Sequence, residues 1–128
     1  LFVAQNLNSP EALARMEAID RFIDRMPGYP GRLYRQSYIQ FIVRNELARG
    51  RVNLGPDHVV ELSAVKVRTL LIASPTDLLA PAPCVKPGAE VLSGAEVRYV
   101  EVHGSHLGMI AGPDAATTTY PLIDEFLG

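Results

Sequence analysis

The residues best suited to chemistry in this sequence are an aspartate and a histidine, each of which follows an apolar, β-favouring run. Asp77 comes after the run 67–73, and His106 comes after the run 97–102, between two glycines. An aspartate that accepts the N–H of an imidazole fixes the tautomer of the ring. It also stabilises the imidazolium that forms when the other nitrogen takes a proton. If the fold brings them together, the two residues predict general acid–base catalysis.

A pair of parallel strands would bring them together. The run 67–73 is almost continuously apolar, which is typical of a strand covered on both faces, as in a parallel sheet. The segment between the two runs is long enough for a crossover, with a short helix near 89–92. Because functional groups gather just past the carboxyl ends of parallel strands, we expect both side chains at one edge of the sheet.

Each residue also has an ordinary structural interpretation. An aspartate after a strand is usually a turn former or a cap, and a histidine between glycines is usually a loop residue. Neither Asp77 nor His106 alone favours catalysis, whereas their placement after two strands of one βαβ unit does.

The remaining elements are expected on both sides of this unit. A helix should run from Pro10 to about residue 26, with Ser9 as its cap, and a second helix should cover 32–49. Gly50 then suits a left-handed helix cap. A β-like stretch at 52–62 is broken by the turn signal Gly-Pro-Asp, and a last helix at 113–127 should be kinked or delayed by its proline, at position 121.

Two other features could form a site: a single cysteine as a nucleophile and a pair of histidines as metal ligands. Cys84 follows Ala-Pro, without a nucleophile elbow or a strong helix-start signal, so a semi-buried structural thiol is favoured over a nucleophile. His103 and His106 have a His-x-x-His spacing, but the glycine and serine between them predict a loop and no third ligand is obvious. The sequence therefore does not favour a metal site.

Composition excludes several classes of function. The 128 residues are 48% hydrophobic with a net charge of −2, which predicts a folded domain and disfavours nucleic-acid binding. No apolar run approaches the ~20 residues that a membrane-spanning helix needs. A single cysteine excludes an internal disulfide and fits a reducing compartment, so we expect the cytoplasm. Eight of the ten arginines lie within 10–51, so the composition changes along the chain.

The order of these features resembles the C-terminal part of an α/β-hydrolase. Over residues 62–127 the chain has a strand, Asp-x-x-x-Pro, a crossover, a second strand, Gly-x-His-x-Gly and a final helix. The helix that begins near Arg32, then Arg-Asn-Glu-Leu at 44–47 and Val-x-Leu at 60–62, is similar to the polyhydroxyalkanoate synthase-like branch. That branch holds acyl-transferring synthases with a Cys nucleophile and esterase- or lipase-like hydrolases with a Ser.

The resemblance implies an α/β fold with two cap-like helices in residues 1–58 and a C-terminal portion of the hydrolase core in residues 59–128. It makes Asp77 the triad acid and His106 the general base for an acyl ester or thioester substrate, without a cofactor. Aromatic residues at this spacing are more often part of a core, but because caps in this family cover the acyl cleft, Tyr34 and Phe41 are the candidates for contact with the substrate.

The nucleophile of such a triad is not in this sequence. The sequence contains neither the Gly-x-Ser-x-Gly pattern of a nucleophile elbow nor its Cys variant. Since the family order is nucleophile, Asp, His, we expect the elbow upstream of Leu1, and this piece alone should be inactive. The alternative is a non-catalytic remnant that serves as a structural or dimerising module, as a homo-oligomer or paired with a missing N-terminal half.

Overall fold

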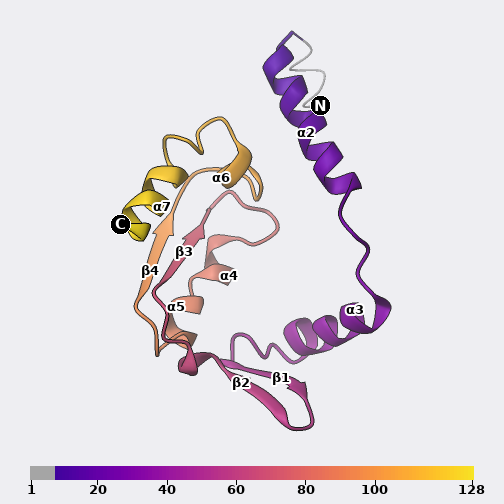
Figure 1. Cartoon of the computed structure of the whole chain (residues 1–128), viewed down its shortest axis with the longest axis vertical. Coiled ribbons are helices and arrows are strands. Elements are labelled where there is room, and N and C mark those ends of the chain that lie inside the picture. The colour runs from indigo at the N-terminus through magenta and orange to yellow at the C-terminus, as the bar shows by residue number, and fades with distance from the viewer. Residues whose placement is uncertain (1–7) are drawn as a thin grey trace. The chain divides into compact units, whose positions relative to one another are not determined.

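A computed structural model describes residues 8–128 as a mixed α/β structure with two small sheets of two strands each (Figure 1). The chain divides into two compact units, and the boundary falls between Gln36 and Ser37. The division between residues 58 and 59 that the resemblance implies would instead run through a β-hairpin, and it stays a prediction about cap and core.

The first unit contains helix α2 (Pro10–Asp24) and the start of helix α3 (Gly31–Ser37). The expected cap is present, because Ser9 Oγ accepts the Ala12 N–H at 3.3 Å. Pro10 then fills the first helical position, where its missing N–H costs nothing. The sequence prediction of a helix from Pro10 is thus confirmed.

The second predicted helix, at 32–49, is wrong in its C-terminal third. After α3 the helix continues only as a π-helical stretch, η1 (Tyr38–Val43), and then turns. The physical reason is a set of polar contacts with the following strand: Glu46 Oε2 accepts the Asn53 N–H at 2.8 Å, and the buried Gln40 amide donates to the Asn53 carbonyl. Gly50 does take the left-handed conformation, with φ of 70°, but it ends a turn and not a helix.

The β-like stretch at 52–62 contains the expected β structure and turn, and its two strands pair as a hairpin. Strand β1 (Arg51–Gly55) pairs antiparallel with β2 (His58–Glu61), and Arg51 and Glu61 form an ion pair at 3.1 Å. A short 3₁₀ turn, η2 (Leu62–Ala64), then leads toward the second sheet.

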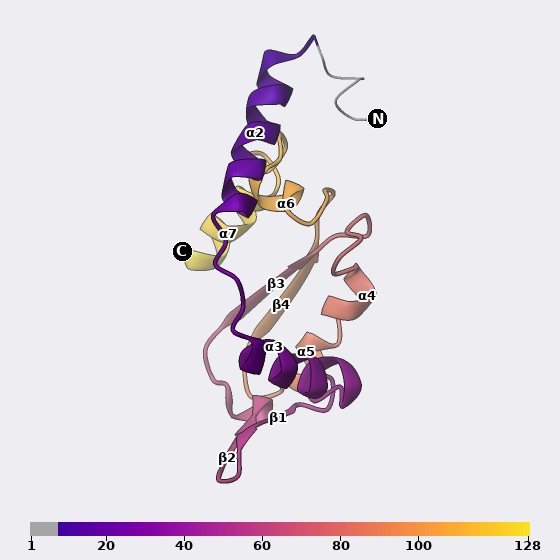
Figure 2. The ribbon, with the colours of Figure 1, turned by 90° about the vertical axis from the view of Figure 1, so that its right-hand side faces the viewer.

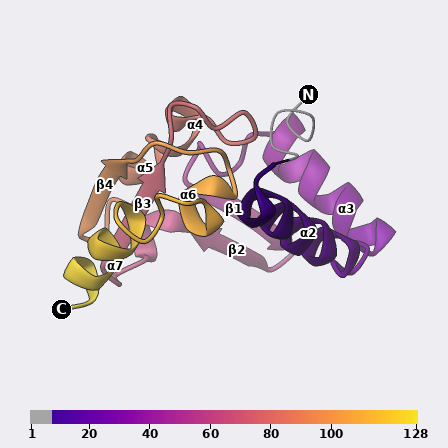
Figure 3. The same ribbon diagram turned by 90° about the horizontal axis from the view of Figure 1, so that it is seen from above.

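The second sheet is the predicted parallel pair. Strand β3 (Thr69–Ala73) lies beside β4 (Val97–Glu101), with Thr69 opposite Val97 and Ala73 opposite Glu101. The crossover carries two short helices, α4 (Ala82–Val85) and α5 (Gly88–Val91), of which the second is the expected one. These helices lie on one side of the strand pair (Figures 2 and 3).

The C-terminal segment covers the other side of β3 and β4 (Figures 2 and 3). It contains a helical turn, α6 (Gly108–Ala111), and helix α7 (Thr119–Leu127), so the final helix begins six residues later than position 113. Pro121 lies in the first turn of α7, where proline is tolerated, which agrees with the expected delay. An ion pair between Arg98 and Glu125, at 3.0 Å, ties α7 to β4.

None of the helices in the described part of the chain is long and apolar enough to cross a membrane. Three of the buried side chains, Gln40, Glu46 and Val52, lie in or near η1 and β1, and the others lie in or after β3 and β4. They include apolar and polar groups: Ala73, Ala82, Val102, Ala115, Ser74, Asp77 and Thr119. The burial of polar groups at the carboxyl end of a parallel pair singles out this edge as the place to look for a site.

Candidate functional site

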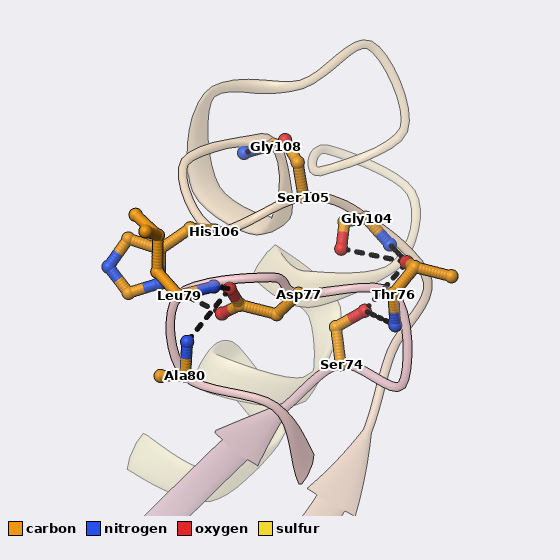
Figure 4. Close-up of polar contacts among 9 residues, drawn as sticks. All are labelled: Ser74, Thr76, Asp77, Leu79, Ala80, Gly104, Ser105, His106 and Gly108. Carbon is orange, nitrogen blue, oxygen red and sulfur yellow. Dashed lines mark hydrogen bonds and ion pairs between the residues drawn. The ribbon is translucent and has the colours of Figure 1, made fainter.

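The structure brings Asp77 and His106 into direct contact. The first lies in the loop after β3 and the second in the loop after β4, so both emerge at the carboxyl end of the parallel pair (Figure 4). Asp77 Oδ2 lies 2.8 Å from His106 Nδ1. The contact that the sequence predicted is therefore confirmed, while the catalytic roles stay predictions.

The Asp77 carboxylate is held by its own loop as well as by the histidine. Its Oδ1 accepts the N–H of Leu79 at 2.8 Å and of Ala80 at 3.1 Å, and its side chain is only 1% exposed. Burial pushes the pKa of Asp77 up, but the bonds from Ala80, His106 and Leu79 outweigh it, so the pKa lies below its usual value. Asp77 is thus a preorganised anion with one oxygen reserved for the imidazole.

The His106 ring is anchored on one side and open on the other. Because Asp77 can only accept when ionised, the bonded Nδ1 carries the proton and Nε2 is left as the basic nitrogen. Figure 4 shows Nε2 directed away from the carboxylate, and the side chain is 47% exposed. A reacting group that approaches from outside can therefore reach the basic nitrogen.

Sequence reasoning missed the hydroxyl groups that join the two loops. Thr76 Oγ1 lies 3.0 Å from Ser74 Oγ and donates to the Gly104 carbonyl at 3.0 Å (Figure 4). The signal was present as two hydroxyl residues, Ser74 and Thr76, just before the aspartate. Ser105 stabilises the histidine loop, because its hydroxyl oxygen accepts the Gly108 N–H at 3.2 Å.

Phe41, which lies in the same unit as this pair, does not share a cleft with it. Phe41 lines a cleft of about 530 Å³ with apolar neighbours from α4 and α5, and neither Asp77 nor His106 is among its lining residues. Tyr34 belongs to the first unit. Substrate contact by Phe41 and Tyr34 stays a prediction.

The expectation of a semi-buried thiol at Cys84 is wrong. The thiol is exposed, and not semi-buried, because α4 presents it at the wall of the cleft that Phe41 also lines. His103, the other half of the His-x-x-His spacing, is also exposed. The Nδ1 of His106 is hydrogen-bonded to the Asp77 carboxylate.

Comparisons with protein-family models, with curated proteins and with solved structures found no match for this chain. The chemistry of the site therefore has to be argued from its own geometry. A buried carboxylate, an oriented imidazole and an open Nε2 together can take a proton from a nucleophile and return it to a leaving group.

Proposed function

We propose that this chain supplies the acid and the base of a Ser/Cys–His–Asp triad in an acyl-transfer enzyme of the α/β-hydrolase type. The polyhydroxyalkanoate synthase-like and esterase- or lipase-like branch fits the sequence features best. The observation that carries the proposal is the 2.8 Å contact between Asp77 Oδ2 and His106 Nδ1, made by a buried carboxylate and an imidazole whose Nε2 faces outward.

In the proposed reaction, His106 Nε2 takes the proton of a Ser hydroxyl or Cys thiol as its oxygen or sulfur attacks the carbonyl carbon of an ester or thioester. The tetrahedral intermediate then collapses, and the imidazolium gives the proton to the departing alcohol or thiol. Water or an acceptor hydroxyl removes the acyl group by the same exchange. Asp77 keeps its charge throughout and stabilises the imidazolium.

The nucleophile of the proposal comes from outside these 128 residues. The sequence has no Gly-x-Ser-x-Gly elbow, Ser74 is fully buried, and Ser105 is engaged with the Gly108 amide. A nucleophile elbow also supplies an oxyanion amide, so a segment that brings the nucleophile would bring electrophilic assistance too.

A covalent probe tests the proposal in the polypeptide that carries this sequence in its natural context. A fluorophosphonate, or an alkylating probe if the nucleophile is Cys, should label one residue outside the present sequence. His106→Gln should slow labelling by about 10²–10⁴-fold, since that is what general acid–base catalysis contributes. His103→Gln is the matched control, because His103 is exposed and three residues away. Labelling that is absent, or equally fast in His106→Gln, would contradict the proposal.

A second candidate function is a structural or dimerising module. Within residues 8–128, β3 pairs in register only with β4, so each strand has one edge without a neighbouring strand. Open strand edges are templates for association with another chain. Light scattering on the purified chain tests this candidate: a dimer whose formation is unaffected by Asp77→Asn and His106→Gln would favour it, and a monomer would exclude it.

A further inference from the structure

One hydroxyl connects the loop of the aspartate to the loop of the histidine. Thr76 immediately precedes Asp77, and Gly104 lies two residues before His106. Thr76 Oγ1 lies 3.0 Å from the Gly104 carbonyl oxygen, and the Gly104 N–H points to the same hydroxyl at 3.4 Å. Both backbone groups of Gly104 are thus held by one side chain of the opposite loop (Figure 4).

The directions of these bonds follow from proton counting. A carbonyl only accepts, so the single proton of the Thr76 hydroxyl goes to Gly104. Ser74 Oγ, at 3.0 Å, must then be the donor to Thr76 Oγ1, and it accepts the Thr76 N–H at 3.1 Å in return. Because Ser74 is 0% exposed, the chain Ser74 to Thr76 to Gly104 starts from a fixed group.

The bridge lies between the sheet and the site. The Val102 N–H donates to the Ala73 carbonyl at 2.9 Å, which extends the strand ladder by one bond. The Thr76–Gly104 bridge comes next along the two loops, and the contact between Asp77 and His106 follows. Three cross-connections in succession therefore align the loops, and the middle one depends on the Thr76 side chain.

Gly104 is the point at which the histidine loop turns. Its φ is 150°, a backbone conformation that residues with a Cβ rarely adopt, and a Cβ there would meet the Met109 nitrogen at 3.0 Å. The direction in which the chain leaves Gly104 determines where the imidazole, two residues later, is placed. A bond that fixes Gly104 thus fixes the approach of His106 to the carboxylate.

We infer that Thr76 is a positioning residue that holds the His106 loop in register with Asp77 through its hydroxyl. The importance of this role for catalysis rests on the proposed function, but the role itself is a property of this chain. A displacement of about 1 Å in a reacting group can cost about 10²-fold in rate, so a single hydroxyl at this place has a large effect.

The test reads the histidine ring directly. In ¹⁵N-labelled chain, at a pH where the imidazoles are neutral, long-range ¹H–¹⁵N correlations report which ring nitrogen carries the proton. Wild type and Thr76→Ser, which keeps the hydroxyl, should both show His106 in the Nδ1–H form. Thr76→Val, which has nearly the same shape but no hydroxyl, should show averaged shifts for the two ring nitrogens.

Two measurements separate positioning from general damage. Thr76 is exposed, so valine at this position meets no steric barrier. Hydrogen exchange of the Val102 amide, which belongs to the strand ladder, should therefore be unchanged in Thr76→Val. If that variant does not fold, Thr76→Ala takes its place, because it also removes the hydroxyl that bonds Gly104, and the same averaging is expected. In the natural-context polypeptide, probe labelling should fall about 10²-fold in Thr76→Val and recover in Thr76→Ser.

The outcomes distinguish this inference from the proposed function. Unchanged His106 shifts in Thr76→Val, or in Thr76→Ala where valine is not tolerated, would overturn the positioning role and leave the Asp77–His106 pair intact. An Nδ1–H form in wild type with no probe labelling would contradict the proposed function and leave the positioning role standing. Wild-type chain without the Nδ1–H form would contradict both.

Discussion

Asp77 and His106 are 29 residues apart in the sequence and meet at 2.8 Å through Oδ2 and Nδ1. The other carboxylate oxygen is bound by two amides of the aspartate's own loop. The orientation of the carboxylate is therefore set by local backbone and does not depend on the histidine. Removing His106 should leave the acid in place, whereas removing the Asp77 side chain should disturb both loops.

The lowered pKa of Asp77 predicts that the free energy of unfolding depends on pH. The folded-state pKa of Asp77 lies below 3.8, so between that value and the lowered pKa the unfolded chain binds more protons. The contribution of Asp77 is fully present above its ordinary pKa and is lost as the pH falls through the lowered one. Urea unfolding from pH 6 to pH 2 should show a steeper loss for wild type than for Asp77→Asn.

Asp114→Asn is the matched control, because it makes the same chemical change at an exposed position. Some slope should remain in every variant, since the hydrogen bond and charge of Arg98 also lower the pKa of Glu125. Parallel curves for wild type and Asp77→Asn would show that the carboxylate is not held as described.

The turn of the histidine loop predicts a costly substitution. Gly104→Ala forces a Cβ into a backbone conformation with φ of 150° and toward the Met109 nitrogen, so it should lower the free energy of unfolding by about 1–3 kcal/mol. Gly55→Ala is the control, because a Cβ at Gly55 meets nothing within 4 Å. Equal unfolding midpoints for the two variants would refute the expected strain.

The small core at the strand ends predicts a matched pair of valine substitutions. Val102 is 8% exposed and Val67 is 70% exposed. Val102→Ala removes two buried carbons and should cost about 1–2 kcal/mol, while Val67→Ala should stay within about 0.5 kcal/mol of wild type. Denaturant unfolding measures both, and a larger effect at Val67 would place the core elsewhere.

If the nucleophile of the proposed triad lies outside these residues, the 128-residue chain alone should be a poor catalyst. Without an elbow and its oxyanion amide, the Asp77–His106 pair has only water to activate. Hydrolysis of p-nitrophenyl acetate should not exceed that by an equal concentration of imidazole, and His106→Ala should change the rate little. A rate well above imidazole that His106→Ala abolishes would show that the chain is sufficient by itself.

The parallel strands and the site pair could be predicted from sequence because their signals are local. Continuous β-favouring runs mark β3 and β4, and the rule that groups gather past the carboxyl ends of parallel strands brings the following loops together. The contact between Asp77 and His106 follows from those two steps alone.

The features that sequence reasoning missed depend on contacts between distant segments. The helix that was expected to reach residue 49 ends at Val43, since Gln40 and Glu46 bind Asn53 across the turn. The role of Thr76 is invisible without the position of Gly104, 28 residues later. Local pattern gives the strands, whereas side-chain partners far along the chain set the ends of elements and the alignment of loops.

The most direct test of the central claim is the protonation of the His106 ring in wild type and in Asp77→Asn. In the variant, the two loop amides need an oxygen at the Oδ1 place, so the asparagine nitrogen takes the Oδ2 place and donates to Nδ1. Ring ¹⁵N spectra should show the proton on Nδ1 in wild type and on Nε2 in Asp77→Asn, with His58 and His103 unchanged. Identical His106 shifts in the two proteins would contradict the account.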